Sequence, residues 1–228
     1  MGKEDQTIMV IERKHLFGQN NQDYFQGFRS ADRVNYESRI LANHLWMRRG
    51  RSDSNLTEDA ESNPDFKQPI AYVIVYNPDL KKVFAYQRSQ ENAAYQEARL
   101  RGNWSWGFGG HIEKADVNLI GKNPIQDSMI RELAEEIETA DVSKPKIIGY
   151  INDDTPHIEP GKIAVGQVHF GILYLVEAKT TQIDPKDQEI TLIESKFLAD
   201  LENICALPNT KVDSWSKIAL EPLRTILI

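Results

Sequence analysis

Three glutamates near the middle of the chain have the type and spacing to bind a hard divalent cation. Glu132, Glu135 and Glu136 fall at positions i, i+3 and i+4, so on a helix their carboxylates share one face. Such like-charge pairs destabilise a helix by about 0.2–0.5 kcal/mol each, and carboxylate oxygens suit Mg²⁺ or Mn²⁺. The adjacent Arg131 could orient one carboxylate through a charge-assisted hydrogen bond. The alternative is a solvated acidic face, which is the commoner use of this pattern.

A glycine-rich stretch precedes this acidic segment. Gly107, Gly109 and Gly110 lie among aromatic residues, and glycine lets backbone N–H and C=O groups approach a ligand closely. On its own the stretch fits a tight turn equally well. Followed by three grouped carboxylates, it predicts a loop in which Gly109 and Gly110 contact the substrate.

A helix over residues 124–138 must position the glutamates. Asn123 is its expected N-cap, and Pro124 suits the first helical turn. Four apolar residues at helical spacing are expected to face a core. They are Met129, Ile130, Leu133 and Ile137.

The rest of the chain mixes predicted strands and helices, which favours an α/β or α+β fold. Strands are expected at 70–76 and 82–88, joined as a hairpin, and at 146–151, with a long apolar run at 165–178. Segment 191–198 alternates and is either a strand or the approach to a helix. Segment 213–228 predicts a closing helix that Pro222 kinks or divides, packed through Trp215, Ile218, Leu223 and Leu227.

Residues 1–66 differ in their residue pattern from residues 67–228. They predict a strand at 7–17, a helix at 36–50 stopped by Gly50, and an exposed polar loop at 51–67. We expect an N-terminal extension that either belongs to the same domain or forms a dimerisation arm. Residues 67–228 then form the main domain with its C-terminal helix.

Composition restricts the class of protein. The 228 residues carry a formal charge of −7 and are 40% hydrophobic, as in an ordinary soluble domain. The acidic balance argues against nucleic acid as a partner, and Cys205, the single cysteine, excludes an internal disulfide framework. With no apolar run of membrane-spanning length and no signal-peptide pattern at the N-terminus, we expect a cytoplasmic protein without membrane contact.

The combination of glycine loop and acidic helix resembles the Nudix hydrolase superfamily, the MutT-like pyrophosphohydrolases. Their box is Gly, five residues, Glu, seven residues, then Arg-Glu-hydrophobic-any-Glu-Glu-any-Gly. Segment 131–136 matches the helical half in full, and segment 109–113 matches the opening. Within the superfamily, the GGHIE and later INDD and VGQVHFG text looks like a bacterial group described only as predicted phosphoesterases. The resemblance implies an α/β/α sandwich with a mixed sheet.

Two departures from the box are visible. Arg131 lies 21 positions after Gly110, seven more than in the box, which implies an insertion within 115–121. This alignment puts Lys122 where the first box Glu is expected. Glu138 replaces the closing Gly, which suggests a longer helix or a different exit from it.

The resemblance also implies site roles and a reaction. Glu132 and Glu136 would be direct metal ligands, and Glu135 a ligand or the residue that activates water. Arg131 would hold a glutamate in place, and the carbonyl of Gly109 would add a ligand. The reaction implied is Mg²⁺-dependent hydrolysis of a pyrophosphate bond in a nucleoside diphosphate linked to another moiety, with Mn²⁺ as the alternative metal.

Several features stay open. A general base could come from a polar residue outside the box, although each is more often structural; the candidates are Asp153, Asp154, His157, Glu159 and Glu177. His169 is interpreted as a packed core histidine. Some aromatic residues could stack a base but more often face a core; they are Trp104, Trp106 and Phe108. Some arginines could contact phosphates but more often are solvated; they are Arg88, Arg99 and Arg101.

The competing hypothesis for function is a non-catalytic Nudix-fold module that senses or binds a nucleotide ligand. A homodimer is compatible with either function.

Overall fold

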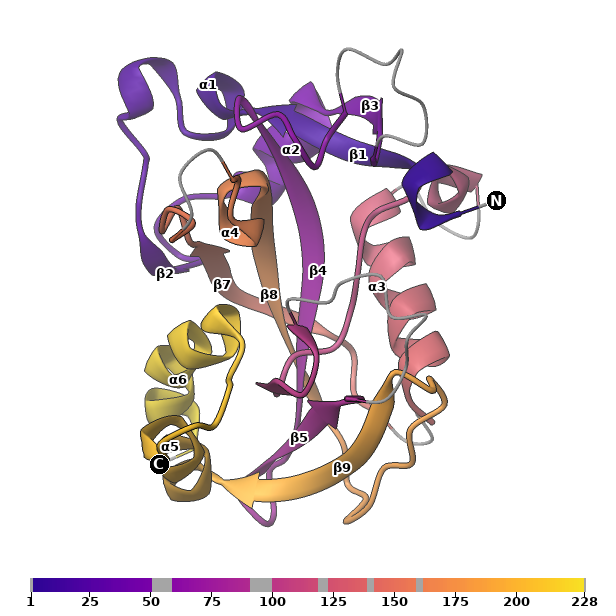
Figure 1. Cartoon of the computed structure of the whole chain (residues 1–228), viewed down its shortest axis with the longest axis vertical. Helices are drawn as coiled ribbons and strands as arrows, with labels where there is room; N and C mark the ends of the chain where they lie inside the picture. Colours follow the sequence, from indigo (N-terminus) through magenta and orange to yellow (C-terminus); the bar gives the residue numbers. More distant parts are fainter. Residues whose placement is uncertain are drawn as a thin grey trace. The chain divides into compact units, whose positions relative to one another are not determined.

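The computed structural model describes residues 2–50, 59–90, 100–118, 123–138, 142–158 and 162–227 (Figure 1). Its contacts group the chain into two compact units. The first comprises Met1–Ala71, Gly110–Met129 and Gly149–Ile172, and the second comprises Tyr72–Gly109, Ile130–Ile148 and Leu173–Ile228. Strands and helices alternate in both, so the α/β class expected from the sequence is confirmed. No helix in the described ranges is long and apolar enough to cross a bilayer.

The first unit contains β1, β2 and β3 and parts of β4, β7 and β8, which pair in the order β2-β7-β8-β4-β1-β3. Their bounds are Gly27–Ser30 for β2, Lys146–Asn152 for β7, His169–Glu177 for β8, Phe66–Asn77 for β4, Thr7–Glu12 for β1 and Leu45–Arg48 for β3. The helices α1 (Arg13–Leu16), α2 (Tyr36–Asn43) and α4 (Val165–Val168) connect them. Five aromatic rings form a buried cluster within this unit: Phe17, Phe25, Tyr36, Tyr150 and Phe170.

The second unit contains β5 (Lys82–Arg88), which pairs with β4, β6 (Trp104–Ser105) and β9 (Ile190–Phe197). Tyr76 lies opposite Val83, which confirms the predicted hairpin. The helices α5 (Leu198–Ala206) and α6 (Ser214–Ile226) follow β9. Segment 191–198 is therefore a strand that leads into a helix.

The loop before the acidic helix is held tightly inside the second unit. A Cβ on Gly107 would lie 1.9 Å from the Tyr72 ring, so no larger residue fits there. The Tyr72 hydroxyl lies 2.8 Å from Ser216 Oγ, which also accepts the Trp106 N–H at 3.1 Å. Helix α6 thus anchors the aromatic stretch that leads to Gly109.

Four local expectations were wrong. The predicted helix at 36–50 ends at Asn43, because His44 is extended and Leu45–Arg48 pairs with β1 as a strand. The polar segment 51–67 is not wholly an exposed loop: residues 51–58 lie outside the described ranges, but Asp59 and Ala60 are buried. The predicted strand at 7–17 ends at Glu12, because Arg13–Leu16 forms the helix α1. Finally, α6 is continuous through the buried Pro222, so the proline does not divide the helix.

Helix α3 (Pro124–Glu136) forms where the sequence predicts it. Asn123 accepts the Ile125 N–H at 3.1 Å, as an N-terminal cap should. Met129, Leu133 and Ile137 are buried, but Ile130 is 53% exposed, so its assignment to the core was wrong. The apolar face of α3 is therefore narrower than the sequence pattern indicates.

Candidate active site

Arg131 holds two of the three predicted glutamates. Its Nη1 lies 2.8 Å from Glu132 Oε1 and 3.3 Å from Glu135 Oε2. The Glu132 side chain is 15% exposed, whereas that of Glu135 is 61% exposed. One guanidinium thus contacts a half-buried carboxylate and a solvated one, and its role in orienting metal ligands stays a prediction.

Glu136 occupies a different environment in the last turn of α3. Its Oε2 accepts a hydrogen bond of 2.9 Å from the backbone N–H of Gly109. Burial, together with the charge of the neighbouring Glu132 carboxylate, raises the pKa of Glu136 to about 8 against the opposing effects of Arg88 and the Gly109 N–H. A carboxylate in this position gains stability as an anion when a cation comes close. The donor set is all oxygen and suits a hard divalent ion.

The glycine loop brings its backbone to this carboxylate. Gly109 has φ +128°, a conformation that L side chains rarely adopt. Its N–H faces Glu136, whereas the sequence interpretation used its carbonyl as a ligand. Gly109 and Gly110 are both partly exposed.

Asp116 was missed as a box residue. It lies six positions after Gly110, where the box has its first Glu, and its side chain is fully buried. Its Oδ2 accepts the Glu113 N–H at 2.7 Å, and its own N–H bonds to the Glu113 carbonyl at 3.0 Å. It therefore closes the loop that the first box Glu would support. Counting six positions on from Gly110, as the box does, would have found it; Lys122, which the sequence alignment placed at the position of the first box Glu, lies outside the described residues.

The candidate general bases have structural partners. Asp154 bonds to Arg13 and Lys67, and the Glu177 carboxylate accepts the Tyr76 hydroxyl at 3.0 Å. Asp153 accepts from Gln26 at 2.9 Å. Glu159 is outside the described ranges. These contacts favour the structural interpretation of Asp153, Asp154 and Glu177.

Of the three aromatic candidates for base stacking, only Trp104 is accessible. Trp106 and Phe108 are fully buried in the core of the second unit. Trp104 lines a surface hollow of about 430 Å³ together with polar residues that include Arg101 and Lys211. The hollow combines an aromatic face with two cationic side chains.

Comparison with known proteins identifies the family. A family model described as the NUDIX domain matches residues 66–216. The chain belongs to the Nudix family. Protein YmaB of Bacillus subtilis (strain 168) is 33% identical over 228 residues, which cover 98% of this chain and 100% of YmaB. The crystal structure of Tm1382, a candidate Nudix hydrolase, gives a TM-score of 0.69 at 20% identity and covers 97% of this chain and 100% of that one. The Nudix assignment made from the box is confirmed, and the enzyme class is hydrolase.

Proposed function

We propose that this Nudix hydrolase cleaves a phosphoanhydride bond in a nucleoside diphosphate linked to another moiety, and that the reaction depends on Mg²⁺ or Mn²⁺. The observation that carries the proposal is the Glu136 carboxylate. It is held by the Gly109 N–H in the box loop, beside Glu132 and in surroundings that disfavour its charge. An ionised carboxylate in such surroundings costs free energy, which a bound cation would offset.

The proposed ligands are the carboxylates of Glu132, Glu135 and Glu136 with the carbonyl of Gly109. A bound cation would neutralise charge on the pyrophosphate oxygens and lower the pKa of the attacking water. Arg131 keeps Glu132 oriented through its 2.8 Å contact. Glu135 has the most exposed carboxylate of the three, so it is the proposed acceptor of the proton that the attacking water loses.

The proposed substrate is a small nucleotide derivative. Trp104 offers an aromatic face for a base, and Arg101 and Lys211 offer charge for phosphates in the same hollow. Gly109 and Gly110 would approach the pyrophosphate with their backbone groups. None of these groups distinguishes one nucleotide from another, so a panel of substrates is needed.

The test is product release from a panel of nucleoside triphosphates, dinucleotides and nucleotide sugars. The wild-type chain is assayed with Mg²⁺, with Mn²⁺ and after chelation, and Glu136→Gln is assayed beside it. We expect metal-dependent turnover that Glu136→Gln lowers by about 10²–10³-fold, the loss typical of a removed electrostatic group.

Glu138→Gln is the matched control, because it removes the same charge from an exposed residue just beyond α3. It should keep wild-type turnover. Equal activity of Glu136→Gln and wild type would contradict the proposed site. Tight ligand binding without turnover across the panel would instead favour the nucleotide-sensing module.

A further inference from the structure

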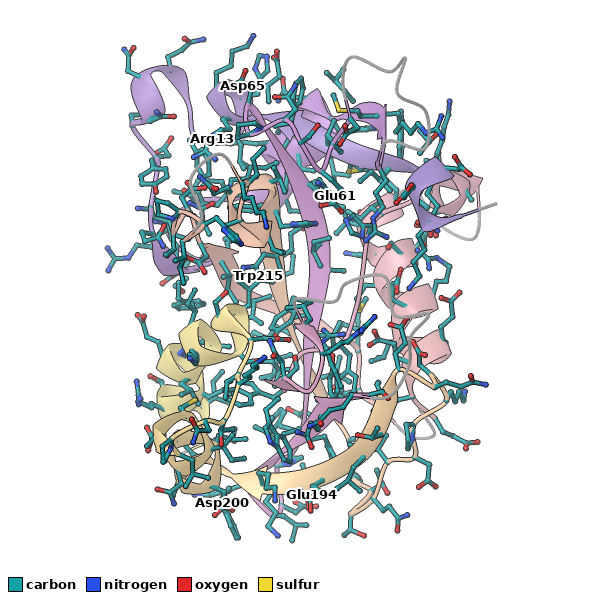
Figure 2. All side chains as sticks on the ribbon, viewed as in Figure 1. Arg13, Glu61, Asp65, Glu194, Asp200 and Trp215 are labelled. Atoms are coloured by element: carbon teal, nitrogen blue, oxygen red, sulfur yellow. The ribbon has the colours of Figure 1, made fainter. Side chains whose placement is uncertain are left out.

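A second group of metal-ligating side chains lies in the first unit and uses none of the α3 glutamates. Glu61, His111 and His169 each present one ligand atom, and these atoms lie within 4.8 Å of one another. Glu61 precedes β4, His111 bridges to Ile70 of β4, and His169 begins β8. Figure 2 labels Glu61 among the side chains of this region. We propose that the three residues bind one divalent transition-metal ion of the zinc class.

His169 is already in the tautomer that a metal ligand needs. Its Nδ1 lies 2.6 Å from the Val165 carbonyl oxygen, which can only accept a hydrogen bond, so the proton is on Nδ1. The Nε2 atom of the neutral ring then carries a lone pair. A second ring nitrogen bonded to a backbone carbonyl is the usual way in which proteins orient a metal-binding histidine.

His111 meets that lone pair. Its Nε2 lies 3.1 Å from His169 Nε2 and 2.7 Å from Gln68 Oε1. Without a metal, His111 Nε2–H serves as the donor to these acceptors. Metal binding at Nε2 therefore requires the His111 ring to change tautomer: the Nε2 proton is released, and the neutral ring takes up a proton on Nδ1.

Gln68 connects the histidine pair to the segment that carries Glu61. Its Nε2 donates to the Ala60 carbonyl at 2.9 Å, which turns Oε1 toward His111. Arg49 Nε lies 3.2 Å from Glu61 Oε1 and restrains that carboxylate. The ligands are therefore oriented by contacts outside the set, and the Gln68 amide oxygen is itself a candidate fourth donor.

The distances and donor types select the ion. Two imidazoles on tetrahedral Zn²⁺, at about 2.0–2.1 Å each, have their nitrogens about 3.3 Å apart, close to the 3.1 Å found here. Two His and one Glu form a recurrent zinc set with an open fourth position. Nitrogen ligands favour zinc, cobalt, nickel or copper over Mg²⁺.

The test is titration of chelator-treated, tag-free full-length protein with ZnCl₂ by calorimetry, with millimolar Mg²⁺ present throughout. We expect one equivalent of Zn²⁺ to bind with micromolar affinity or tighter. X-ray absorption of that complex should show two imidazole nitrogens at about 2.0 Å. Absence of saturable Zn²⁺ binding, or a spectrum without imidazole ligands, would overturn the proposal.

Variants assign the binding to these residues. His111→Gln and Glu61→Gln are chosen because both side chains are partly exposed, whereas His169 is buried. Each should weaken Zn²⁺ binding at least about tenfold and abolish the rise in unfolding temperature that Zn²⁺ gives the wild type. Circular dichroism without Zn²⁺ checks that both variants fold.

Two controls separate this site from other binding. His15→Gln disrupts a surface His–Glu pair, in which His15 Nε2 lies 3.0 Å from Glu12, and should leave Zn²⁺ affinity unchanged. Glu136→Gln should also leave it unchanged. Loss of Zn²⁺ binding in Glu136→Gln, with wild-type affinity in His111→Gln, would assign the ion to the α3 glutamates and refute the second site.

Discussion

The backbone N–H of Gly109 donates a hydrogen bond of 2.9 Å to Oε2 of Glu136. This contact joins the glycine loop to the last turn of α3. In the family box the loop comes first along the chain and the helix follows it. The contact also explains why residue 109 is glycine, since φ +128° brings the N–H to the carboxylate. The loop therefore positions a carboxylate as well as approaching a ligand.

Gly109→Ala should damage both stability and activity. An L side chain at this backbone conformation costs about 1–3 kcal/mol, and relief of that strain moves the N–H away from Glu136. We expect a lower unfolding temperature and a loss of about tenfold or more in kcat/KM, by analogy with other misplaced catalytic groups. Thermal unfolding and turnover are measured on the same preparation.

Gly27→Ala is the matched control for this prediction. Gly27 also has a positive φ, +89°, and a Cβ there would meet no atom within 4 Å. The control should lose stability without a specific loss of turnover. Wild-type activity in Gly109→Ala would show that its hydrogen bond to Glu136 is dispensable.

Arg131→Ala should affect metal use more than stability. Its pair with Glu135 is solvent-exposed and its pair with Glu132 only partly buried, and exposed pairs contribute about 0–1 kcal/mol. Loss of a group that orients metal ligands typically costs about 10–100-fold in metal affinity or activity. We therefore expect a higher Mg²⁺ concentration for half-maximal activity, with an unfolding temperature within a few degrees of wild type.

Arg224→Ala provides the comparison. Arg224 forms a 2.8 Å surface pair with Glu202 in the second unit and belongs to no proposed site. Its Mg²⁺ dependence should match that of the wild type. An unchanged Mg²⁺ requirement in Arg131→Ala would mean that Glu132 is positioned without the guanidinium.

Local signals in the sequence predicted α3 and the β4–β5 hairpin because their determinants are local. Asn123 and Pro124 mark the helix start, and a turn separates two apolar runs. The strand Leu45–Arg48 could not be predicted in this way. It forms because β1, far away in sequence, offers pairing partners that outweigh helical spacing.

The two groups of ligand residues differ in the same respect. The α3 glutamates lie within one helix, so spacing alone groups them. Glu61, His111 and His169 are brought together only by the pairing of β4 and β8 in the first unit. His169 is buried as the sequence suggested, but its contact with His111 could not be seen in an apolar run.

The exposed position of Ile130 gives a direct test of the packing face of α3. Ile130 is 53% exposed and Leu133 is 5% exposed. Ile130→Ala should change the free energy of unfolding by no more than about 0.5 kcal/mol, whereas Leu133→Ala should cost about 2–5 kcal/mol. Urea unfolding of both variants measures the difference, and equal losses would show that Ile130 is buried in solution.

Lys67 and Asp154 form a buried ion pair in the first unit. The Lys67 side chain is fully buried, and its Nζ donates to Asp154 Oδ1 and to the Gly166 carbonyl, both at 2.7 Å. Burial raises the pKa of Asp154, but hydrogen bonds and charge from Arg13 and Lys67 outweigh this and hold it well below its usual range. Burial lowers the pKa of Lys67 to about 8, against the opposing effect of Asp154.

Asp154→Asn should therefore destabilise the protein in a pH-dependent way. It leaves the Lys67 ammonium buried without its counter-charge, a loss of about 3–5 kcal/mol near pH 7. Because the folded-state pKa of Asp154 lies below its unfolded value, the carboxylate stabilises the fold above about pH 4, and this contribution is lost as pH falls further. The gap between wild type and variant should shrink from pH 5 to pH 2.5 in urea unfolding. The control is Asp65→Asn at an exposed position, whose free energy of unfolding should follow that of the wild type at each pH. A difference between Asp154→Asn and wild type that stays constant with pH would contradict the ion pair.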